Sequence, residues 1–456
     1  MNLDWLLESL AQRGDADAVI DGSQAYSYRA LLAAIARWST TFAGRGLAGR
    51  VVSIEAEYGL EAVAAIVGAA IGGNILVPIS MAVDAHRDMF LAMADVEYRV
   101  TPSDGDRPVV ATGREAAHPF YRALRQAATP GLVLFSSGTS GTPKAAVHDL
   151  GMLLQKFKVP RHAFRTLVFL QLDHIGGLNT LFYTLSNGGT VVIAESRMPR
   201  EVCAAIARHR VQLLPTSPTF LNMLLLSEEH QRHDLSSLEL ITYGTEPMPA
   251  HTLERVHAAF PNTRLLQTYG LSELGILRSQ SREPGSLWIR VGGEGFVTKI
   301  VDGRLFVKAQ SAMLGYLNAP SPFDEEGYFD TGDLVERDGD WLRILGRATE
   351  VINVGGNKVL PVEVENVLLA MENVADVEVH GEPSPIMGKI VVATVRLAHP
   401  EDPAAFKTRM RLFCQGRLPD YKMPTRVRFS DGLHSARFKK VRGSGSAAAA
   451  LEATGS

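Results

Sequence analysis

Leu134-Phe135-Ser136-Ser137-Gly138-Thr139-Ser140-Gly141-Thr142-Pro143-Lys144 is the run of residues around which this 456-residue chain is organised. The apolar residues 132–135 predict a buried strand that leads into a loop of hydroxyl side chains, glycines, one proline and one lysine. Glycines allow backbone N–H groups to approach phosphate oxygens, hydroxyls add hydrogen-bond donors, and a lysine adds positive charge. The loop therefore favours a polyphosphate ligand.

The loop does not match two better-known motifs. A Walker loop requires Gly-x-x-x-x-Gly-Lys-Ser/Thr, whereas Gly138, Gly141 and Lys144 are spaced three apart with Pro143 before the lysine. A Gly-x-Ser-x-Gly nucleophile elbow is excluded because the glycines stand at the wrong distances from Ser140. On composition alone, a Ser/Thr/Gly-rich turn without a ligand remains the alternative.

The order of residues in the loop closely resembles the phosphate loop of the adenylate-forming superfamily. This superfamily includes acyl-CoA synthetases, aryl-acid ligases, luciferases and the adenylation domains of peptide synthetases. The resemblance implies that Lys144 takes part in catalysis. It also implies that the nucleotide is bound by Ser136, Ser137, Gly138, Thr139, Ser140 and Gly141.

Composition and charge are typical of a soluble globular protein. Hydrophobic residues make up 46% and charged residues 21% of the chain, and the net charge of −3 argues against a nucleic-acid partner. Two widely separated cysteines indicate a reducing compartment, and residues 1–5 do not resemble a signal peptide. The most apolar segment, 62–79, contains Asn74 and Pro78 and predicts a helix and a short strand, not a transmembrane segment. We expect a cytoplasmic protein.

Strand and helix patterns alternate along the N-terminal part. Strands are predicted at 18–20, 51–55 and 75–77 and helices at 28–42 and 61–71, and this alternation favours a mostly parallel sheet. The same alternation returns after the Ser/Thr/Gly loop and predicts a second sheet of similar build.

Shorter elements follow. Residues 284–306 predict antiparallel strands in a small barrel or meander, and a small α+β unit begins after 346–350. We expect an N-terminal adenylation core domain at 1–348, a C-terminal domain at 349–442, and a linker or appended tail at 443–456. The resemblance implies a matching α/β fold: a large domain of two αβα sheets plus a small β-barrel, followed by a smaller, mobile α+β domain.

A second motif, Gln267-Thr268-Tyr269-Gly270-Leu271-Ser272-Glu273, is similar to the family's Tyr-Gly-x-Thr-Glu, with serine in place of threonine. By this resemblance Glu273 holds Mg²⁺ on the nucleotide phosphates, Ser272 meets the α-phosphate, and Tyr269 and Gly270 border the adenine. The alternative is a strand end followed by a helix-capping Ser272.

A third motif, Gly327-Tyr328-Phe329-Asp330-Thr331-Gly332-Asp333, resembles the family's Trp/Tyr-x-x-Thr-Gly-Asp. The resemblance implies that Asp333 accepts hydrogen bonds from both ribose hydroxyls, for which one carboxylate has enough lone pairs. Arg347 matches the arginine that relatives place near the same ribose and the phosphates.

Two further segments resemble the walls of the family's acid pocket. His174 looks like the histidine that lies near the reacting carboxylate in acyl-CoA synthetases. Amino-acid-activating relatives have an aspartate at that place; here Asp173 is one residue earlier and would point away from it in an extended segment, which favours a plain carboxylic acid. Near adenine and the pocket floor the resemblance implies a loop that contains Gly244, Thr245 and Glu246.

The C-terminal motifs are less regular. Lys439, three residues before Arg442, resembles the lysine that reaches into the site during adenylation, and Lys440 is a competing candidate. The resemblance implies that Gly355 and Gly356 line a pantetheine tunnel, and Thr349 falls at the hinge, where relatives have Asp or Lys. A basic solvated tail is the alternative for 439–442.

Together the motifs imply an ATP-dependent, AMP-forming acid–thiol ligase. An acyl-CoA synthetase of this type uses ATP and Mg²⁺ to convert a small carboxylic acid, here expected to be aryl or fatty, to an acyl adenylate with pyrophosphate release. The adenylate then forms a thioester with CoA. Two alternatives remain: an acyl carrier protein whose phosphopantetheine thiol is the acceptor, or an adenylate-binding module without turnover.

Overall fold

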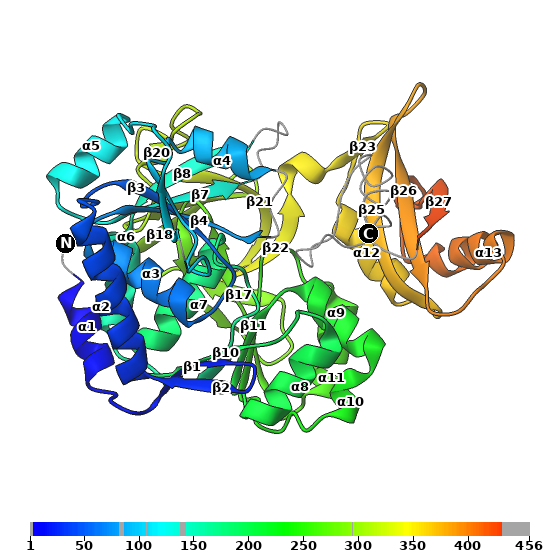
Figure 1. Ribbon diagram of the computed structural model, residues 1–456. Helices are drawn as coiled ribbons and strands as arrows, with labels where there is room; N and C mark the ends of the chain where they lie inside the picture. Colours follow the sequence, from blue (N-terminus) through cyan, green and yellow to red (C-terminus); the bar gives the residue numbers. More distant parts are fainter. Residues whose placement is uncertain (1–2, 82–85, 106, 137–142, 294, 431–456) are drawn as a thin grey trace.

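A computed structural model describes residues 3–81, 86–105, 107–136, 143–293 and 295–430 of the chain. Among the described residues, a large N-terminal part contains three large sheets and a two-stranded hairpin, and a smaller C-terminal unit lies to one side of it at the yellow-to-red end of the chain (Figure 1). This agrees with the predicted α/β fold, which has a large domain followed by a small one.

The first sheet has seven strands in the order β20-β8-β7-β4-β3-β5-β6. Its central strands β7, β4, β3 and β5 are parallel, whereas β8, β20 and β6 are antiparallel to their neighbours. The bounds are β3 (Val51–Glu55), β4 (Ile75–Ile79), β5 (Tyr98–Val100), β6 (Val109–Ala111), β7 (Gly131–Ser136), β8 (Lys144–Asp149) and β20 (Gly315–Tyr316).

The second sheet, in the order β13-β12-β11-β9-β10-β1-β2, is parallel except for the edge pair β1 and β2. It comprises β1 (Asp17–Asp21), β2 (Gln24–Ser27), β9 (Arg165–Leu167), β10 (Thr190–Ile193), β11 (Leu213–Thr216), β12 (Leu240–Tyr243) and β13 (Arg264–Gln267). The two mostly parallel sheets predicted from the alternating pattern are therefore confirmed.

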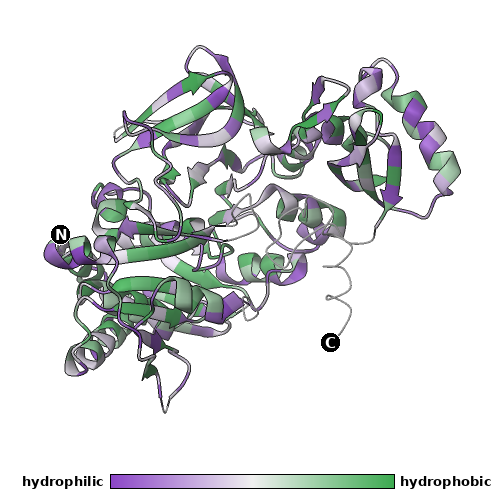
Figure 2. Cartoon of the chain, turned by 90° about the horizontal axis from the view of Figure 1, so that it is seen from above, coloured by the Kyte–Doolittle hydropathy of each residue, from purple (hydrophilic) through white to green (hydrophobic). Residues whose placement is uncertain are grey.

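Helices cover the first and second sheets of the large part. They are α1 (Asp4–Ala11), α2 (Tyr28–Gly44), α3 (Leu60–Ile71), α4 (Arg87–Met93), α5 (Pro119–Gln126), α6 (Leu150–Leu154), α7 (Ile175–Ser186), α8 (Pro199–His209), α9 (Pro218–Ser227), α10 (Glu229–Arg232) and α11 (Ala250–Ala259). Apolar residues are concentrated in the interior strands and polar residues on the outer helices and loops, as expected for a water-exposed surface (Figure 2).

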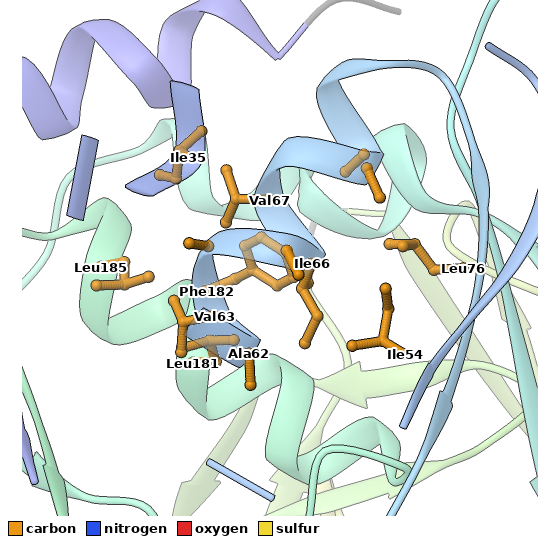
Figure 3. Close-up of a cluster of buried hydrophobic side chains, with 14 of the residues drawn as sticks. Ile35, Ile54, Ala62, Val63, Ile66, Val67, Leu76, Leu181, Phe182 and Leu185 are labelled. Carbon is orange, nitrogen blue, oxygen red and sulfur yellow. The ribbon is translucent and has the colours of Figure 1, made fainter. Parts of the chain in front are cut away.

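One apolar cluster joins α3 and α7 to strands of both sheets. It includes Leu76 of the first sheet and Val191 of the second, and Phe182 of α7 lies against Val63 and Ile66 of α3 (Figure 3). Residues 62–70 of helix α3 are all apolar and all buried, so the helix packs against the core on every side. The segment 62–79 is thus a helix and a strand of a globular core, as predicted. Among the described residues, no helix is long and apolar enough to cross a bilayer.

The third sheet has six antiparallel strands in the order β16-β17-β22-β21-β19-β18, where the sequence predicts a small barrel or meander. Its strands are β16 (Ser279–Ser281), β17 (Trp288–Val291), β18 (Phe296–Val301), β19 (Arg304–Ala309), β21 (Phe329–Asp338) and β22 (Trp341–Arg347). A separate hairpin, β14 (Tyr269–Leu271) and β15 (Gly275–Leu277), lies between this sheet and β13 in the chain.

The C-terminal unit is α+β and has its own apolar core. Its elements are β23 (Ile352–Val354), β24 (Asn357–Val359), α12 (Pro361–Leu369), β25 (Val374–Ser384), β26 (Gly388–Leu397), α13 (Pro403–Cys414) and β27 (Arg426–Phe429). Hydrogen bonds that connect it to the large part include one from Asn222 Nδ2 to Ala375 O (3.2 Å) and one from Ala250 N to Asn366 Oδ1 (2.9 Å).

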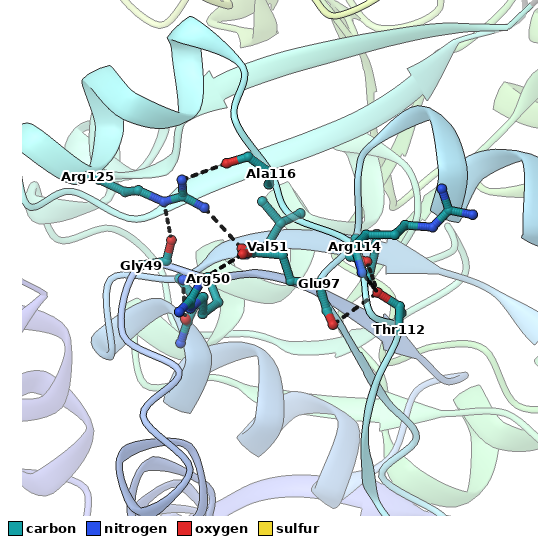
Figure 4. A network of polar contacts seen from close by, with 10 residues as sticks. Gly49, Arg50, Val51, Glu97, Thr112, Arg114, Ala116 and Arg125 are labelled. Atoms are coloured by element: carbon teal, nitrogen blue, oxygen red, sulfur yellow. Dashed lines mark hydrogen bonds and ion pairs between the residues drawn. The ribbon is translucent and has the colours of Figure 1, made fainter.

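A buried carboxylate at the edge of the first sheet ties three segments together (Figure 4). Glu97, whose side chain is 3% exposed, accepts hydrogen bonds from the Arg50 guanidinium (2.8 Å), the Val51 backbone N–H (2.9 Å) and the Arg125 guanidinium (3.0 Å). These three donors offset the free-energy cost of burying the Glu97 carboxylate, whereas an unpaired buried anion would destabilise the fold.

Buried His148 of β8 links the first sheet to the β14–β15 hairpin. Its Nε2 lies 2.6 Å from the Ser272 carbonyl oxygen, and since a carbonyl only accepts, the neutral ring donates from Nε2. Burial lowers the pKa of His148 to about 4, against the opposing effect of hydrogen bonds to the Ser272 and Ser311 backbone. The ring is therefore neutral at physiological pH.

We expect His148 to make the protein less stable as the pH falls. Above pH 6.5 the ring is neutral in the folded and unfolded chain; between about 6.5 and 4 only the unfolded chain takes up the proton, so stability is lost as the pH falls. At pH 5 this loss is about 2 kcal/mol. His148→Gln retains a donor but does not titrate, so its urea midpoint should fall less between pH 7.5 and pH 5 than that of the wild type. Equal falls in both proteins would contradict the prediction, because all other titrating groups are shared.

Candidate active site

Ser136 and Lys144 stand opposite each other at the ends of β7 and β8, where the two strands pair. Residues 137–141 of the predicted phosphate loop lie outside the described residues. Asn318 borders the end of the loop, since its Nδ2 donates to Pro143 O (2.8 Å) and its Oδ1 accepts from Ala145 N (3.0 Å).

Glu273 lies in the turn of the β14–β15 hairpin and is 8% exposed. Its Oε1 accepts a hydrogen bond from Tyr316 Oη at 2.7 Å and a longer one from Ser136 Oγ at 3.4 Å. Lys144 Nζ lies 5.1 Å from the centroid of the Tyr316 ring, within cation–π range. The predicted metal ligand and two predicted loop residues are thus brought together around Tyr316.

A second group forms around Asp333, in the middle of β21. Tyr269 Oη donates to Asp333 Oδ2 at 2.6 Å, and Arg347 Nε lies 3.4 Å from Asp333 Oδ1. Burial raises the pKa of the Asp333 carboxyl, while the Tyr269 hydroxyl and the Arg347 guanidinium oppose that rise. Burial, followed by the Asp333 charge, also raises the pKa of Tyr269 well above its usual value, so Tyr269 remains a donor.

The two groups belong to one site. Tyr269 and Glu273 are on the same hairpin, four positions apart; Tyr269 contacts Asp333 in the second group, and Glu273 contacts Tyr316 in the first. The positive charge of Arg347 acts on both tyrosines: it lowers the pKa of Tyr269 and of Tyr316, against the larger rise caused by their burial. Ser136, Lys144, Glu273, Asp333 and Arg347 therefore converge, although they span 212 positions of the sequence, from 136 to 347 inclusive.

Close packing explains two glycines of this region. A Cβ at Gly244 would lie 2.6 Å from Thr268 Oγ1 and 2.8 Å from Thr268 O, and a Cβ at Gly270 would lie 2.7 Å from Gly275 O. At Gly244, which the sequence places near the pocket floor, contact with the Thr268 backbone thus leaves no room for a side chain.

The two residues after Gly244 differ: Thr245 has an unusual backbone conformation, and Glu246 caps a helix. Thr245 has a φ of +74°, which is rare for a β-branched residue and is the kind of backbone strain found at functional sites. The Glu246 carboxylate accepts a hydrogen bond from Thr219 N (2.7 Å) at the first turn of α9. That contact directs Glu246 towards the N-terminal end of a helix, where a negative charge is favourable.

His174 directly precedes α7, and Asp173 does not point away from it. Leu172 and Asp173 lie in a turn that the extended His174 follows, and His174 Nε2 lies 3.9 Å from Asp173 Oδ1. The expectation that alternation along a strand separates these side chains is therefore wrong, and it no longer favours a plain acid over an amino acid.

Gly355 and Gly356 form the β23–β24 turn of the C-terminal unit, with φ of +55° and +87°. Gly355 N donates to Met387 O (2.9 Å). Lys439 and Lys440 lie outside the described residues.

Three residues of this region were not identified from the sequence: Tyr316, His148 and Asn318. Each contacts the site through a residue distant in sequence, and no motif surrounds any of them. A local signal for Tyr316 is the glycine before it. Gly315 has a φ of +151°, and Tyr316 directly after it pairs with Ala146 of β8.

Comparison with known proteins finds relatives among CoA ligases. The chain is 32% identical to indoleacetate–CoA ligase of Aromatoleum aromaticum over 69% of its own length and 66% of the relative's. It is 32% identical to 4-coumarate–CoA ligase-like 5 of Oryza sativa over 63% of its length and 56% of the relative's. The chain thus spans somewhat less than two thirds of these relatives, whereas a match to 2-succinylbenzoate–CoA ligase of Bacillus subtilis, at 26% identity, covers 94% of both chains.

Solved structures with this fold include an anthranilate CoA ligase in complex with anthranoyl-AMP, with a TM-score of 0.80, 22% identity, and coverage of 96% of this chain and 95% of that one. The o-succinylbenzoate CoA synthetase of Bacillus subtilis, in complex with its acyl-adenylate intermediate, has a TM-score of 0.77 at 24% identity and 96% coverage of both chains. At these identities the likeness shows a shared fold.

Family models match most of the chain. The model described as AMP-binding enzyme matches residues 6–317, and the AMP-binding enzyme C-terminal domain matches residues 363–440. The first model thus matches most of the large part, and the second matches most of the smaller C-terminal unit. The chain belongs to the AMP-binding enzyme family, part of the adenylate-forming superfamily.

Proposed function

We propose that this protein activates a carboxylic acid with ATP to form an acyl adenylate and pyrophosphate, and then transfers the acyl group to the thiol of CoA. The observation that carries the proposal is the convergence of a phosphate-loop end (Ser136, Lys144), a buried carboxylate (Glu273) and a second carboxylate with its arginine (Asp333, Arg347). These groups match, in chemistry, the parts of one nucleoside triphosphate.

The proposed nucleotide contacts follow from the donor and acceptor chemistry. A buried Asp333 retains lone pairs beyond those used by Tyr269 and Arg347, so it can accept hydrogen bonds from the two ribose hydroxyls. Lys144 and the residues 136–141 are proposed to hold the phosphates, and Gly244, Thr245, Tyr269 and Gly270 to border the base. Ser272 is proposed to contact the α-phosphate.

The residues present fit a Mg²⁺ ion bound together with the nucleotide. Mg²⁺ usually takes one or two carboxylates and completes its shell with phosphate oxygens and water. Both hydrogen bonds to Glu273 go to Oε1, so within the described part of the chain Oε2 has no protein donor. When bound, the ion would neutralise charge on the phosphates; Glu273 would hold it, and Tyr316 and Ser136 would orient Glu273.

Two chemical steps follow from this arrangement. First, an oxygen of the substrate carboxylate bonds to the α-phosphorus as the bond to the leaving pyrophosphate breaks. Lys144 and Lys439 are proposed to neutralise the charge that develops on phosphoryl oxygens. Second, the sulfur of the thiol bonds to the activated carbonyl carbon as the bond from that carbon to the AMP oxygen breaks; AMP leaves and the thiol proton passes to water. His174 is proposed to line the acid pocket, and Gly355 and Gly356 the thiol's path.

The substrate is proposed to be an aromatic carboxylic acid. Two relatives have names that refer to indoleacetate and 2-succinylbenzoate, which are aryl acids, and to CoA as the thiol. We further propose that residues 1–348 and 349–442 act as the two domains and that the hinge is Thr349, in the short 3-10 helix Ala348–Glu350. An acyl carrier protein in place of CoA remains the second acceptor to test.

A panel of acids tests the proposal. We expect acid-dependent exchange of labelled pyrophosphate into ATP with at least one aryl acid, and formation of its CoA thioester by mass spectrometry. Asp333→Ala should abolish both, since it removes the proposed ribose acceptor. Adenylate formation that needs a phosphopantetheinylated carrier protein for thioester formation would exclude CoA as acceptor, and no exchange with any acid would indicate a nucleotide-binding module without turnover.

Removing one hydroxyl tests the place of Tyr316. Tyr316→Phe keeps the ring beneath Lys144 but loses the donor to Glu273, so kcat/KM for Mg-ATP should fall about tenfold, the effect of a hydrogen bond to a charged group. Tyr183→Phe is the matched control, because it loses only a 3.3 Å hydrogen bond to His162 O. If the two variants have the same kcat/KM, the hydroxyl does not support the site.

Separate half-reactions test Lys439. Lys439→Ala should slow adenylate formation about 100-fold or more, through lost transition-state charge neutralisation, yet leave thioester formation from the preformed acyl adenylate within a few-fold of wild type. Lys440→Ala is the control and should affect neither step strongly. Equal losses in both half-reactions, or the reverse order of the two variants, would refute the assignment.

A further inference from the structure

A cavity lies in the six-stranded sheet. It has a volume of about 750 Å³ and is lined by both edge strands, β16 and β18, and by the turn between β21 and β22. The sheet therefore curls until its two edges face the same hollow, and 750 Å³ is within the usual range for a small-molecule site. This hollow is hereafter called the sheet groove.

The sheet groove is positively charged. Arg278, Arg290 and Arg337 line it, and among the described residues none of them has a carboxylate within ion-pair distance. Lys299 also lines it but is paired with Asp324 (3.2 Å), and the lining contains one carboxylate, Asp340. Other arginines of the same sheet are neutralised, as Arg343 is by Glu336 at 2.5 Å. The lining of the sheet groove thus has a local surplus of positive charge, although the net charge of the chain is −3.

Two of the arginines are held in place by neutral groups. The Arg290 guanidinium donates to Gln280 Oε1 at 2.7 Å and lies 5.8 Å from the Trp341 ring. Arg337 Nε donates to Gly339 O at 2.7 Å. These contacts use one donor each and leave the others of each guanidinium free for a ligand. Planar, pre-oriented guanidinium groups are the preferred protein partners of phosphate.

The backbone of the groove is also open to a ligand. Gly292 lines it with a φ of +127°, and a Cβ built on it would meet nothing within 4 Å. Packing therefore does not require glycine there, and the left-handed backbone with free space above it lets a ligand approach the main chain closely.

We propose that the sheet groove binds a small anion that carries at least two phosphate groups, with Arg278, Arg290 and Arg337 as its ligands. The site is separate from the candidate active site. Arg337 is four residues beyond Asp333 on β21, about 13 Å along the strand, and lies at the turn of the β21–β22 hairpin, away from Arg347. The proposal rests on the groove itself and holds whether or not the proposed ligase reaction occurs.

Isothermal titration of the full chain tests the proposal. Inorganic pyrophosphate, ADP and adenosine 3′,5′-bisphosphate are titrated separately in Mg²⁺-free buffer into the wild type and into Arg290→Gln/Arg337→Gln. For at least one of these anions we expect one of two results: the wild type binds one more molecule per chain than the double variant does, or it binds with a Kd about tenfold lower. Pyrophosphate alone would identify an inorganic diphosphate as the ligand; ADP or the bisphosphate would identify a nucleotide.

A double variant of equal charge serves as control. Arg200→Gln/Arg208→Gln removes two exposed arginines of α8, outside the sheet groove, and should bind as the wild type does. If both double variants weaken binding equally, the effect is one of net charge and the proposal is overturned. It is also overturned if none of the three anions loses affinity or an equivalent in Arg290→Gln/Arg337→Gln.

Discussion

The β14–β15 hairpin holds the three sheets of the large part in one arrangement. It continues directly from β13 of the second sheet, its Ser272 carbonyl accepts from His148 of the first, and its Tyr269 donates to Asp333 of the third. The Tyr269–Asp333 hydrogen bond is buried, and the His148 ring that donates to Ser272 is fully buried, so the loss of one partner would leave a buried polar group unsatisfied. Because all three sheets are connected to this one nine-residue segment, 269–277, a shift of any sheet would displace the candidate active site.

This arrangement also explains how two buried carboxylates are tolerated before a ligand arrives. Glu273 and Asp333 each accept hydrogen bonds from a tyrosine, and Lys144 and Arg347 lie nearby. Burying an isolated anion is unfavourable; the tyrosine hydroxyls lower that cost for both carboxylates, and at Asp333 the Arg347 guanidinium, 3.4 Å away, adds a counter-charge. The carboxylates therefore stay oriented and able to accept further partners, which is the preorganisation that charge-stabilising catalysis requires.

The sequence predicts local features of this protein well and contacts between distant segments poorly. The alternating patterns identify both parallel sheets, because strand and helix periodicity is local, and the motifs identify Ser136, Glu273 and Asp333, because each stands in a recognisable run. Tyr316 and His148 could not be found in this way, since their importance comes from the pairing of β20 with β8 and of β8 with the hairpin. The error at Asp173 has a similar origin: the side-chain direction was inferred from a strand, and the segment is a turn.

The arrangement of the two domains fits a division of labour between the proposed half-reactions. Acid activation and thioester formation need different groups at the same carboxyl carbon, so one fixed set of C-terminal residues would serve only one of them. The polar links between the domains include two hydrogen bonds between a side chain and the backbone, one donated by Asn222 and one accepted by Asn366, each worth about 1 kcal/mol. The C-terminal unit has its own core and does not depend on those links to fold. We propose that a change of orientation about residues 348–350 lets the segment that carries Lys439 and the turn that carries Gly355 act on the site in succession.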